Sequence, residues 1–484
     1  MNEISNIKFK AFSSIIWKIL ERVAAQGVSL VVSITLARLL IPDDYSVVSI
    51  VSIFFVFCNL FISSGFNTAL IQKKNADIDD YSSVLWLSLA ISVIMYAIMF
   101  FSAPYIASLY QKEILVPVIR VMGITFFVSA YKGVLCAHIS SALQFKSFFL
   151  ATISGTVISA IVGILMALNG FGPWALVFQQ MTNTVIDTVL LTITSKVKFR
   201  FRISFERLKE LFRYGWKMFA TSIIAVTYDE IKPLIIGIKF KSVDLAYYNK
   251  GRSFPQLINS TVTDSISAVL FPVISKVQDD ENAVLNITRK YMRVSSYIIF
   301  PLLLGFFAVS ENFIKIILTE KWIPILPYIK IFTFDYLLNI VQVGNQQSVK
   351  AIGRSDIILK LEIVKKTLYF IVVTLFIFFA NSPYVIAASS IVCTIIATIV
   401  NVYPNVKLIG YAYKKQFMDL LPNMVLAMIM FIIVTFVGRL NISAMPLLFI
   451  QIVVGFISYL LLSIFTKNSN LKYILDLIKE RKGE

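Results

Sequence analysis

The feature that most constrains this chain is a succession of apolar segments, each roughly 20 residues long, separated by short polar connections. A segment of that length is what an α-helix needs to cross the hydrocarbon core of a bilayer. Hydrophobic residues make up 58% of the 484 residues, which is more than a water-soluble core of this size buries. We therefore expect an all-α integral membrane protein.

The hydropathy pattern predicts about fourteen transmembrane helices. Their expected ranges are 15–37, 46–66, 83–103, 114–135, 148–168, 174–194, 215–237, 254–275, 292–311, 325–346, 357–380, 383–402, 421–440 and 445–465. The first apolar segment is too long for the core of a cleavable signal peptide, so we expect it to remain as a membrane anchor.

The charged residues indicate how the helices are oriented. The chain has a formal net charge of +18. With the N-terminus in the cytoplasm, the connections on that side carry about three times as many lysines and arginines as those on the other side, as the positive-inside rule predicts. This asymmetry favours about fourteen crossings with both termini cytoplasmic.

The two halves of the chain resemble each other. Trp17-Lys18 begin the first predicted helix and Trp216-Lys217 begin the seventh, and each of these helices ends in a turn that contains aspartate. Two halves of six helices in the same orientation are typical of secondary transporters, whose substrate site lies between them. The predicted parts are an N-lobe with helices 1–6 (1–200), a C-lobe with helices 7–12 (201–405), and helices 13–14 with a basic tail (406–484).

Four predicted helices carry polar side chains along one face. Ionisable groups within membrane spans are costly and normally face a bundle interior or a watery cavity. Such residues also occur as snorkelling side chains near helix ends and as polar contacts between helices. A shared cavity explains all four helices together, and its cations and amides suit an anionic, sugar-bearing ligand. The predicted substrate-binding residues are Lys18, Arg22, Gln26, Lys217, Arg252, Gln256 and Asn259, and the candidate ion-coupling carboxylates are Glu21, Asp229, Asp264 and Asp335.

Motifs for catalysis or nucleotide hydrolysis are missing from the sequence. It contains no phosphate-binding loop of the Gly-x-x-x-x-Gly-Lys type, and its single histidine, His138, cannot form a metal site or a catalytic triad alone. Asp77-x-Asp79 matches a metal-binding motif of glycosyltransferases, but it lies in a short connection, and we interpret it as a solvated loop end. We therefore expect no catalytic residues, no metal and no cofactor.

Several stretches resemble a known family. They are Leu36–Tyr45, Ser64–Lys74, Asp80–Ser83, Leu270–Asp280 and Lys321–Pro324. They are similar to the polysaccharide-flippase branch of the multidrug/oligosaccharidyl-lipid/polysaccharide exporter superfamily, and most of all to lipopolysaccharide (O-antigen), colanic-acid and teichuronic-acid exporters. One departure is Ser46, where this family usually has glycine.

The resemblance implies a fold of two six-helix lobes plus two C-terminal helices. It also implies that the chain moves polyprenyl-pyrophosphate-linked oligosaccharide across a bacterial plasma membrane by alternating access, with lipid, a polysaccharide polymerase and other glycan-assembly proteins as partners and no nucleic acid. A multidrug antiporter of the same fold is the alternative, although cationic helix faces oppose cationic drugs. A membrane enzyme of glycan assembly is a further alternative, which the missing catalytic motifs oppose.

The longest polar connection, Ser195 to Tyr214, is predicted to be cytoplasmic because it contains seven basic residues. It is expected either to link the lobes or to form an amphipathic interfacial helix with Phe205, Leu208, Leu211 and Phe212 on one side. A cysteine introduced in this connection should resist a membrane-impermeant thiol reagent in intact cells and react after lysis. Labelling in intact cells would contradict the topology.

Overall fold

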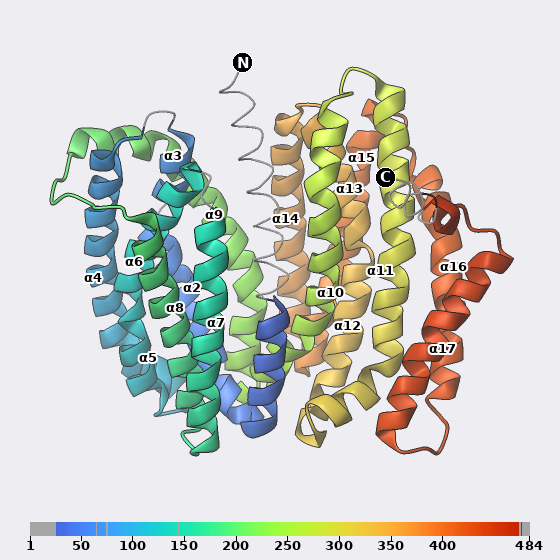
Figure 1. Cartoon of the computed structure of the whole chain (residues 1–484), viewed down its shortest axis with the longest axis horizontal. Coiled ribbons are helices and arrows are strands. Elements are labelled where there is room, and N and C mark those ends of the chain that lie inside the picture. Colours follow the sequence, from blue (N-terminus) through green and yellow to red (C-terminus); the bar gives the residue numbers. More distant parts are fainter. Residues whose placement is uncertain (1–25, 64, 74–75, 143–144, 474–475, 477–484) are drawn as a thin grey trace. The chain divides into compact units, whose positions relative to one another are not determined.

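The computed structural model describes residues 26–63, 65–73, 76–142, 145–473 and 476. Over these residues the regular structure is entirely helical (Figure 1). The chain divides into two compact units, Met1–Ala246 and Tyr247–Glu484, which we call unit 1 and unit 2 and describe one at a time.

The helices of unit 1 follow one another with short connections. They are Gln26–Leu39, α2 (Pro42–Ser63), α3 (Phe66–Gln72), α4 (Ile78–Leu109), α5 (Leu115–Gly123), α6 (Thr125–Ser141), α7 (Phe145–Leu168), α8 (Pro173–Ser195) and α9 (Phe205–Lys239). Helix α10 (Ser242–Ser275) begins in unit 1 and continues into unit 2.

The remaining helices belong to unit 2. They are α11 (Glu281–Ile317), the short 3₁₀ helix η1 (Glu320–Ile325), α12 (Leu326–Leu337), α13 (Asn339–Ala351), α14 (Ser355–Phe379), α15 (Pro383–Leu408), α16 (Tyr413–Val437) and α17 (Ala444–Phe465).

The all-α membrane fold predicted from hydropathy is confirmed. Each predicted span overlaps a helix of the structure, the first of them through its described part, Gln26–Leu39. Nine helical stretches of the described chain are long and apolar enough to cross a bilayer. The total of about fourteen crossings stays a prediction.

Two helices that the sequence predicts as continuous are interrupted. The predicted span 114–135 is divided between α5 and α6 at Ile124, and the span 325–346 is divided between α12 and α13 at Leu338. At both points the carbonyl accepts a hydrogen bond from the residue three positions later, Phe127 and Val341 respectively, so the helix tightens locally. These are the fourth helices of the two predicted halves, which supports the internal repeat.

Unit 1 is built on pairs of neighbouring helices. Helices α7 and α8 pack along their length, α4 contacts α5 and α6, and α6 contacts α8. Helix α9 packs against α2, α3 and α4, so the helix predicted to open the C-lobe lies in unit 1. The lobe boundaries at residues 200 and 405 remain predictions.

The start of α9 differs from the expected interfacial helix. A helix does begin at Phe205, but Leu208 and Leu211 are buried in a cluster with Phe66 and Leu70 of α3. Phe205 and Phe212 are 82% and 52% exposed. The four residues of the predicted apolar side therefore do not share one environment. The two leucines pack in the protein core instead of contacting lipid, and the two phenylalanines are exposed.

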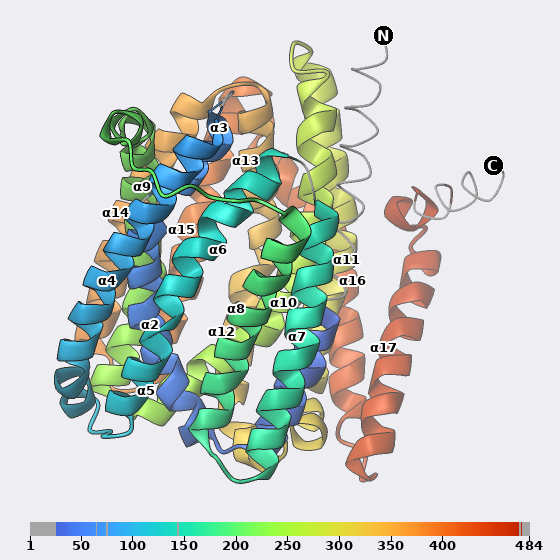
Figure 2. The ribbon, with the colours of Figure 1, turned by 60° about the vertical axis from the view of Figure 1, so that its left-hand side comes forward.

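Unit 2 is organised around α11. This helix contacts α16 and α17 as well as α12 and α13, and α14 and α15 form a further pair (Figure 2). Phe300 and Leu303 of α11 are almost fully buried with Val341 of α13 and Met430 of α16 in one continuous apolar core. Helix α11 therefore packs between α12 and α13 on one side and α16 and α17 on the other, and joins them through one apolar core.

Gly65 sits at the closest approach of two backbones in unit 1. Its φ of +73° is the left-handed conformation that favours glycine, and it begins α3. A Cβ atom on Gly65 would lie 2.2 Å from the carbonyl oxygen of Gly215 in α9. The contact between α3 and α9 therefore depends on a hydrogen atom at this position.

Replacing Gly65 with alanine should strongly destabilise the protein. The left-handed backbone costs an L-residue roughly 1–2 kcal/mol, and overpacking adds about 1–3 kcal/mol. The melting temperature of the purified protein in detergent should fall clearly for Gly65→Ala. The matched control is Gly27→Ala, because a Cβ atom at Gly27 meets nothing within 4 Å. Equal melting temperatures for the two variants would contradict the contact.

Candidate functional site

The helix interruption at Leu338 lies beside polar contacts between α10 and the α12–α13 pair. The Nε group of Arg252 donates a hydrogen bond to the Tyr336 hydroxyl at 3.3 Å. Two turns further along α10, the Nδ2 group of Asn259 donates to the Oδ1 atom of Asn339 at 3.2 Å. Broken helices at membrane depth are tolerated where they line a cavity or bind polar groups. The interruption therefore places its polar neighbours next to α10.

The polar groups continue from α13 into α14 and α15. Gln342 donates to the hydroxyl of Thr394 at 3.2 Å. Gln346 donates to Glu362 and to Asn401, both at 3.4 Å, and Lys365 donates to Glu362. We call this set the polar column; it consists of Arg252, Asn259, Tyr336, Asn339, Gln342, Gln346, Glu362, Lys365, Thr394 and Asn401.

Two buried amide groups of the polar column lack a partner within the described part of the chain. They are the Oδ1 atom of Asn259, which is an acceptor, and the Nδ2 group of Asn401, which is a donor. Both side chains are at least 90% buried. An unpaired buried polar group costs about 1–3 kcal/mol, so its presence requires an explanation such as a ligand. The polar column can thus offer both an acceptor and a donor to a hydroxyl-rich molecule.

The predicted site residues are only partly brought together. Arg252 and Asn259 line the polar column, while Gln256 is exposed on α10. Asp335 is half-buried on α12.

The other predicted site residues lie elsewhere. Lys217 and Asp229 are exposed on α9 of unit 1, and Gln26 is half-buried in the first described helix. Lys18, Glu21, Arg22 and the side chain of Asp264 lie outside the described residues. Their convergence with Arg252 on one cavity stays a hypothesis.

The sequence reasoning did not select two ion pairs inside predicted spans, in which Lys365 and Asp187 are the buried members. Glu362 and Lys365 pair within α14, and Lys132 of α6 donates to Asp187 of α8. Asp187 is 6% exposed. Opposite charges inside apolar segments are the signal that could have identified these residues, because a buried charge needs a partner.

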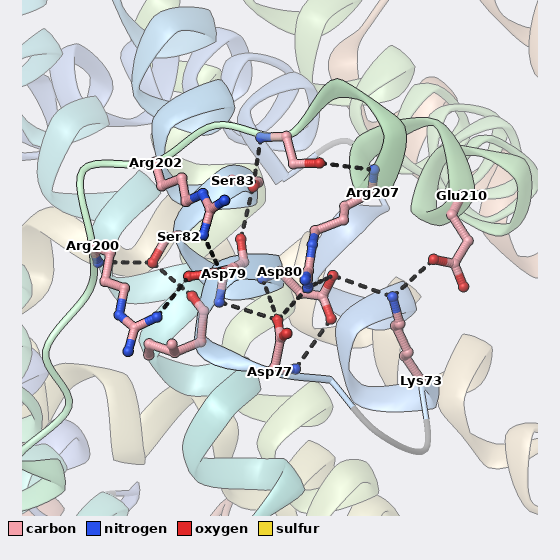
Figure 3. Close-up of polar contacts among 12 residues, drawn as sticks. Lys73, Asp77, Asp79, Asp80, Ser82, Ser83, Arg200, Arg202, Arg207 and Glu210 are labelled. Carbon is pink, nitrogen blue, oxygen red and sulfur yellow. Dashed lines mark hydrogen bonds and ion pairs between the residues drawn. The ribbon is translucent and has the colours of Figure 1, made fainter.

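A second polar group connects the end of α3 and the start of α4 to the segment before α9 and to the first turns of α9 (Figure 3). We call it the loop cluster; it consists of Lys73, Asp77, Asp79, Asp80, Arg200, Arg202, Arg207 and Glu210. The carboxylate of Asp77 accepts hydrogen bonds from the backbone N–H groups of Asp79 and Asp80, and Asp80 accepts one from Asp77 in return. This reciprocal arrangement caps α4.

Arginines from the connection pair with these carboxylates. Arg200 and Arg202 each donate to Asp79 at 3.3 Å, and Arg207 donates to Asp77 and Asp80. The backbone N–H groups of Arg200 and Ser204 also donate to the hydroxyls of Ser82 and Ser83 in α4 (Figure 3). Asp77-x-Asp79 is therefore not a merely solvated loop end, because it caps α4 and fastens the connection to it.

Hydrogen bonding from Arg207 holds the pKa of Asp77 at about 2, below its ordinary value of 3.8. Because the pKa is depressed in the folded state, the contact stabilises the fold fully above pH 3.8 and loses that effect as the pH falls towards about 2. The pKa of Arg207 is raised by the same contact and by Asp80. The loop cluster therefore has a structural role, and Asp77 stays ionised at neutral pH.

Residues 35–327 match the model of a family described as polysaccharide biosynthesis protein. The chain belongs to this family. Its resemblance to polysaccharide exporters, predicted from sequence, is confirmed.

Relatives of this chain come from several bacteria. An "uncharacterized membrane protein in cps region" of Klebsiella pneumoniae is 24% identical over 67% of this chain and 68% of that protein. The teichuronic acid biosynthesis protein TuaB of Bacillus subtilis is 24% identical over 62% and 63%. The lipopolysaccharide biosynthesis protein WzxC of Escherichia coli is 22% identical over 75% and 74%.

Solved structures show the same fold. The lipid II flippase MurJ in an inward closed conformation aligns with a TM-score of 0.75 at 16% identity, over 94% of this chain and 99% of that one. An inward-facing multidrug resistance transporter of the MATE family aligns at 0.58 and 15% identity, over 80% and 94%. The chain thus has the all-helical fold that these two transporters share.

Removing one arginine of the loop cluster should loosen the connection before α9. Arg207→Gln deletes the ion pairs to Asp77 and Asp80, so chymotrypsin should cleave after Phe201, which is 86% exposed, several-fold faster than in the unmodified protein. The control is Arg213→Gln, an exposed residue of the same helix outside the loop cluster. An unchanged cleavage rate for Arg207→Gln would show that the ion pairs do not fasten the connection.

Proposed function

We propose that this protein is a flippase that moves polyprenyl-pyrophosphate-linked oligosaccharide from the cytoplasmic to the outer leaflet of a bacterial plasma membrane. Family membership supports this function, as does the fold shared with a lipid II flippase. The observation that carries it in the structure is the polar column, which places hydrogen-bonding groups inside an otherwise apolar helical unit.

The polar column suits both parts of such a cargo. Arg252 carries a guanidinium whose geometry matches phosphate oxygens, and the Tyr336 hydroxyl orients it. Asn259 and Asn401 offer a buried acceptor and a buried donor to sugar hydroxyls. The gain from satisfying these groups favours a hydroxylated ligand over an apolar one.

Transport would proceed by alternating access of the two lobes, which exposes the same site to each leaflet in turn. We propose that Lys18, Arg22, Gln26 and Lys217 contribute to it together with the polar column, with Glu21, Asp229, Asp264 and Asp335 as candidate ion-coupling groups. Both termini would be cytoplasmic, and a polysaccharide polymerase and other glycan-assembly proteins would act on the product at the outer leaflet.

The two candidate functions differ in a measurable way. Deleting the gene for a flippase should remove the surface glycan and make lipid-linked oligosaccharide accumulate on the inner leaflet. Deleting the gene for a multidrug antiporter should leave the glycan intact and lower the concentrations of cationic drugs that inhibit growth. The second outcome would overturn the proposal.

Reversing the charge of Arg252 should abolish glycan export while the protein still reaches the membrane. Arg252→Glu would repel the pyrophosphate, whereas Arg252→Lys keeps the charge, loses the fork geometry, and should retain partial export. The readout is surface glycan in a deletion strain that expresses each variant at equal membrane levels. Arg22→Glu should behave in the same way if both arginines serve one site.

The matched control is Lys414→Gln, because Lys414 is an exposed cation at the start of α16 outside the polar column. It should export at nearly normal levels. Near-normal export by a well-expressed Arg252→Glu variant would mean that Arg252 has only a structural role.

A further inference from the structure

A buried carboxylate lies where α11 and α16 meet in unit 2. Asp419 of α16 has a side chain that is 2% exposed. It accepts hydrogen bonds from Nε and Nη2 of Arg289 at 2.8 and 3.0 Å, from Arg293 Nε at 2.8 Å, and from the Tyr411 hydroxyl at 2.8 Å. Two guanidinium groups therefore share one negative charge.

The positive charge of this arrangement faces outward. The side chains of Arg289 and Arg293 are 33% and 41% exposed, while the carboxylate between them is buried. Each guanidinium has five N–H groups, and Asp419 binds only some of them. Lys290 lies next to the two arginines with its Nζ atom 3.7 Å from the centre of the Tyr473 ring. The surface offers charged donors that suit a phosphate.

The turn after α17 encloses these cations. Lys467 adopts a left-handed conformation with a φ of +50°, which ends the helix and turns the chain back. Asn468 and Asn470 then donate to the Oδ1 atom of Asn423, which is fully buried on α16 and itself donates to the Arg293 carbonyl. The turn is therefore built into the protein and forms a fixed wall.

Two adjoining cavities result from this packing. One, of about 220 Å³, is lined by Arg289, Lys290, Arg293, Ser469, Asn470 and Tyr473 among others. The other, of about 590 Å³, shares Arg293, Ser469 and Asn470 and extends along α16 past Met418, Leu421 and Val425. Met418 and Val425 are 56% and 46% exposed. The cavity lined by Arg289, Lys290 and Arg293 thus adjoins one whose lining includes the apolar residues Met418, Leu421 and Val425.

We infer that these two cavities bind an anionic phospholipid of the surrounding bilayer. Its phosphate would contact the outward N–H groups of Arg289 and Arg293 together with Lys290 and Lys467, and an acyl chain would lie along Met418 and Val425. Inorganic phosphate would contact the cations but not the apolar residues Met418 and Val425. A lipid without net charge would contact these apolar residues but would gain little from the cations.

The expected membrane position fits this ligand. The start of α11, the start of α16 and the turn after α17 all fall on the predicted cytoplasmic side, where anionic lipids attract basic residues. The site shares no residue with the polar column, and the inference goes beyond transport of the oligosaccharide, since it concerns a lipid that stays in the membrane.

Native mass spectrometry of the purified full-length protein can test the site. In neutral detergent, phosphatidylglycerol should bind more tightly than phosphatidylcholine of the same chain length, and inorganic phosphate should not compete at equal concentration. Lys290→Gln and Lys467→Gln leave Asp419 and its donors in place, and each should weaken phosphatidylglycerol binding about fivefold. Val425→Ser should weaken the binding of both phospholipids.

The control is Lys415→Gln, an exposed cation of α16 that lines neither cavity and should change affinity less than twofold. Equal affinity for the two phospholipids, or equal affinity of Lys290→Gln and the unmodified protein, would overturn the inference. Tight binding of decaprenyl pyrophosphate with no binding of phosphatidylglycerol would also overturn it and assign the site to the cargo. Because binding is measured without transport, failure here is distinct from failure of the flippase function.

Discussion

The structure depends on one constraint of the bilayer, which is that a polar group within hydrocarbon needs a partner inside the protein. This requirement explains why the polar side chains within the helices gather in sets. Lys132 contacts Asp187 in unit 1, and Asn259 contacts Asn339 in unit 2. Outward positions on other helices are apolar, as Phe101 of α4 and Phe456 of α17 show with exposures of 80% and 68%. Helix orientation follows from where each polar partner lies.

The same constraint determines how much of the fold the sequence could predict. Length and hydropathy locate the helices, because each crossing needs a long apolar segment regardless of what it packs against. The interruptions at Ile124 and Leu338 could not be located in this way, since hydropathy indicates how long a segment is and not where its helix breaks. They depend on local i→i+3 hydrogen bonds and on packing, as at Gly123, where a Cβ atom would meet the ring of Tyr96 at 2.7 Å.

The site was predictable in the same partial sense. Spacing along one helix placed Arg252 and Asn259 on a predicted polar face, but it could not identify the residues of α12 and α13 to which they donate hydrogen bonds. The loop cluster shows more clearly that sequence alone does not identify the partners of a charged residue. Asp79 is separated by more than a hundred residues from the arginines that bind it, so the short acidic motif considered alone looked like a solvated loop. Partners far apart in sequence become evident only through tertiary structure.

The degree to which polar groups are satisfied separates structural sites from binding sites. Asp419 accepts hydrogen bonds from three side chains, which leaves it little capacity for a ligand and explains its burial without loss of stability. In the polar column, Asn259 and Asn401 each hold one hydrogen-bonding group without a described partner. A transporter site must release what it binds, so moderate contacts of neutral amides suit it better than saturated ion pairs. These amides therefore complement Arg252 in the site that we propose for the cargo, whereas Asp419 serves to position the arginines around it.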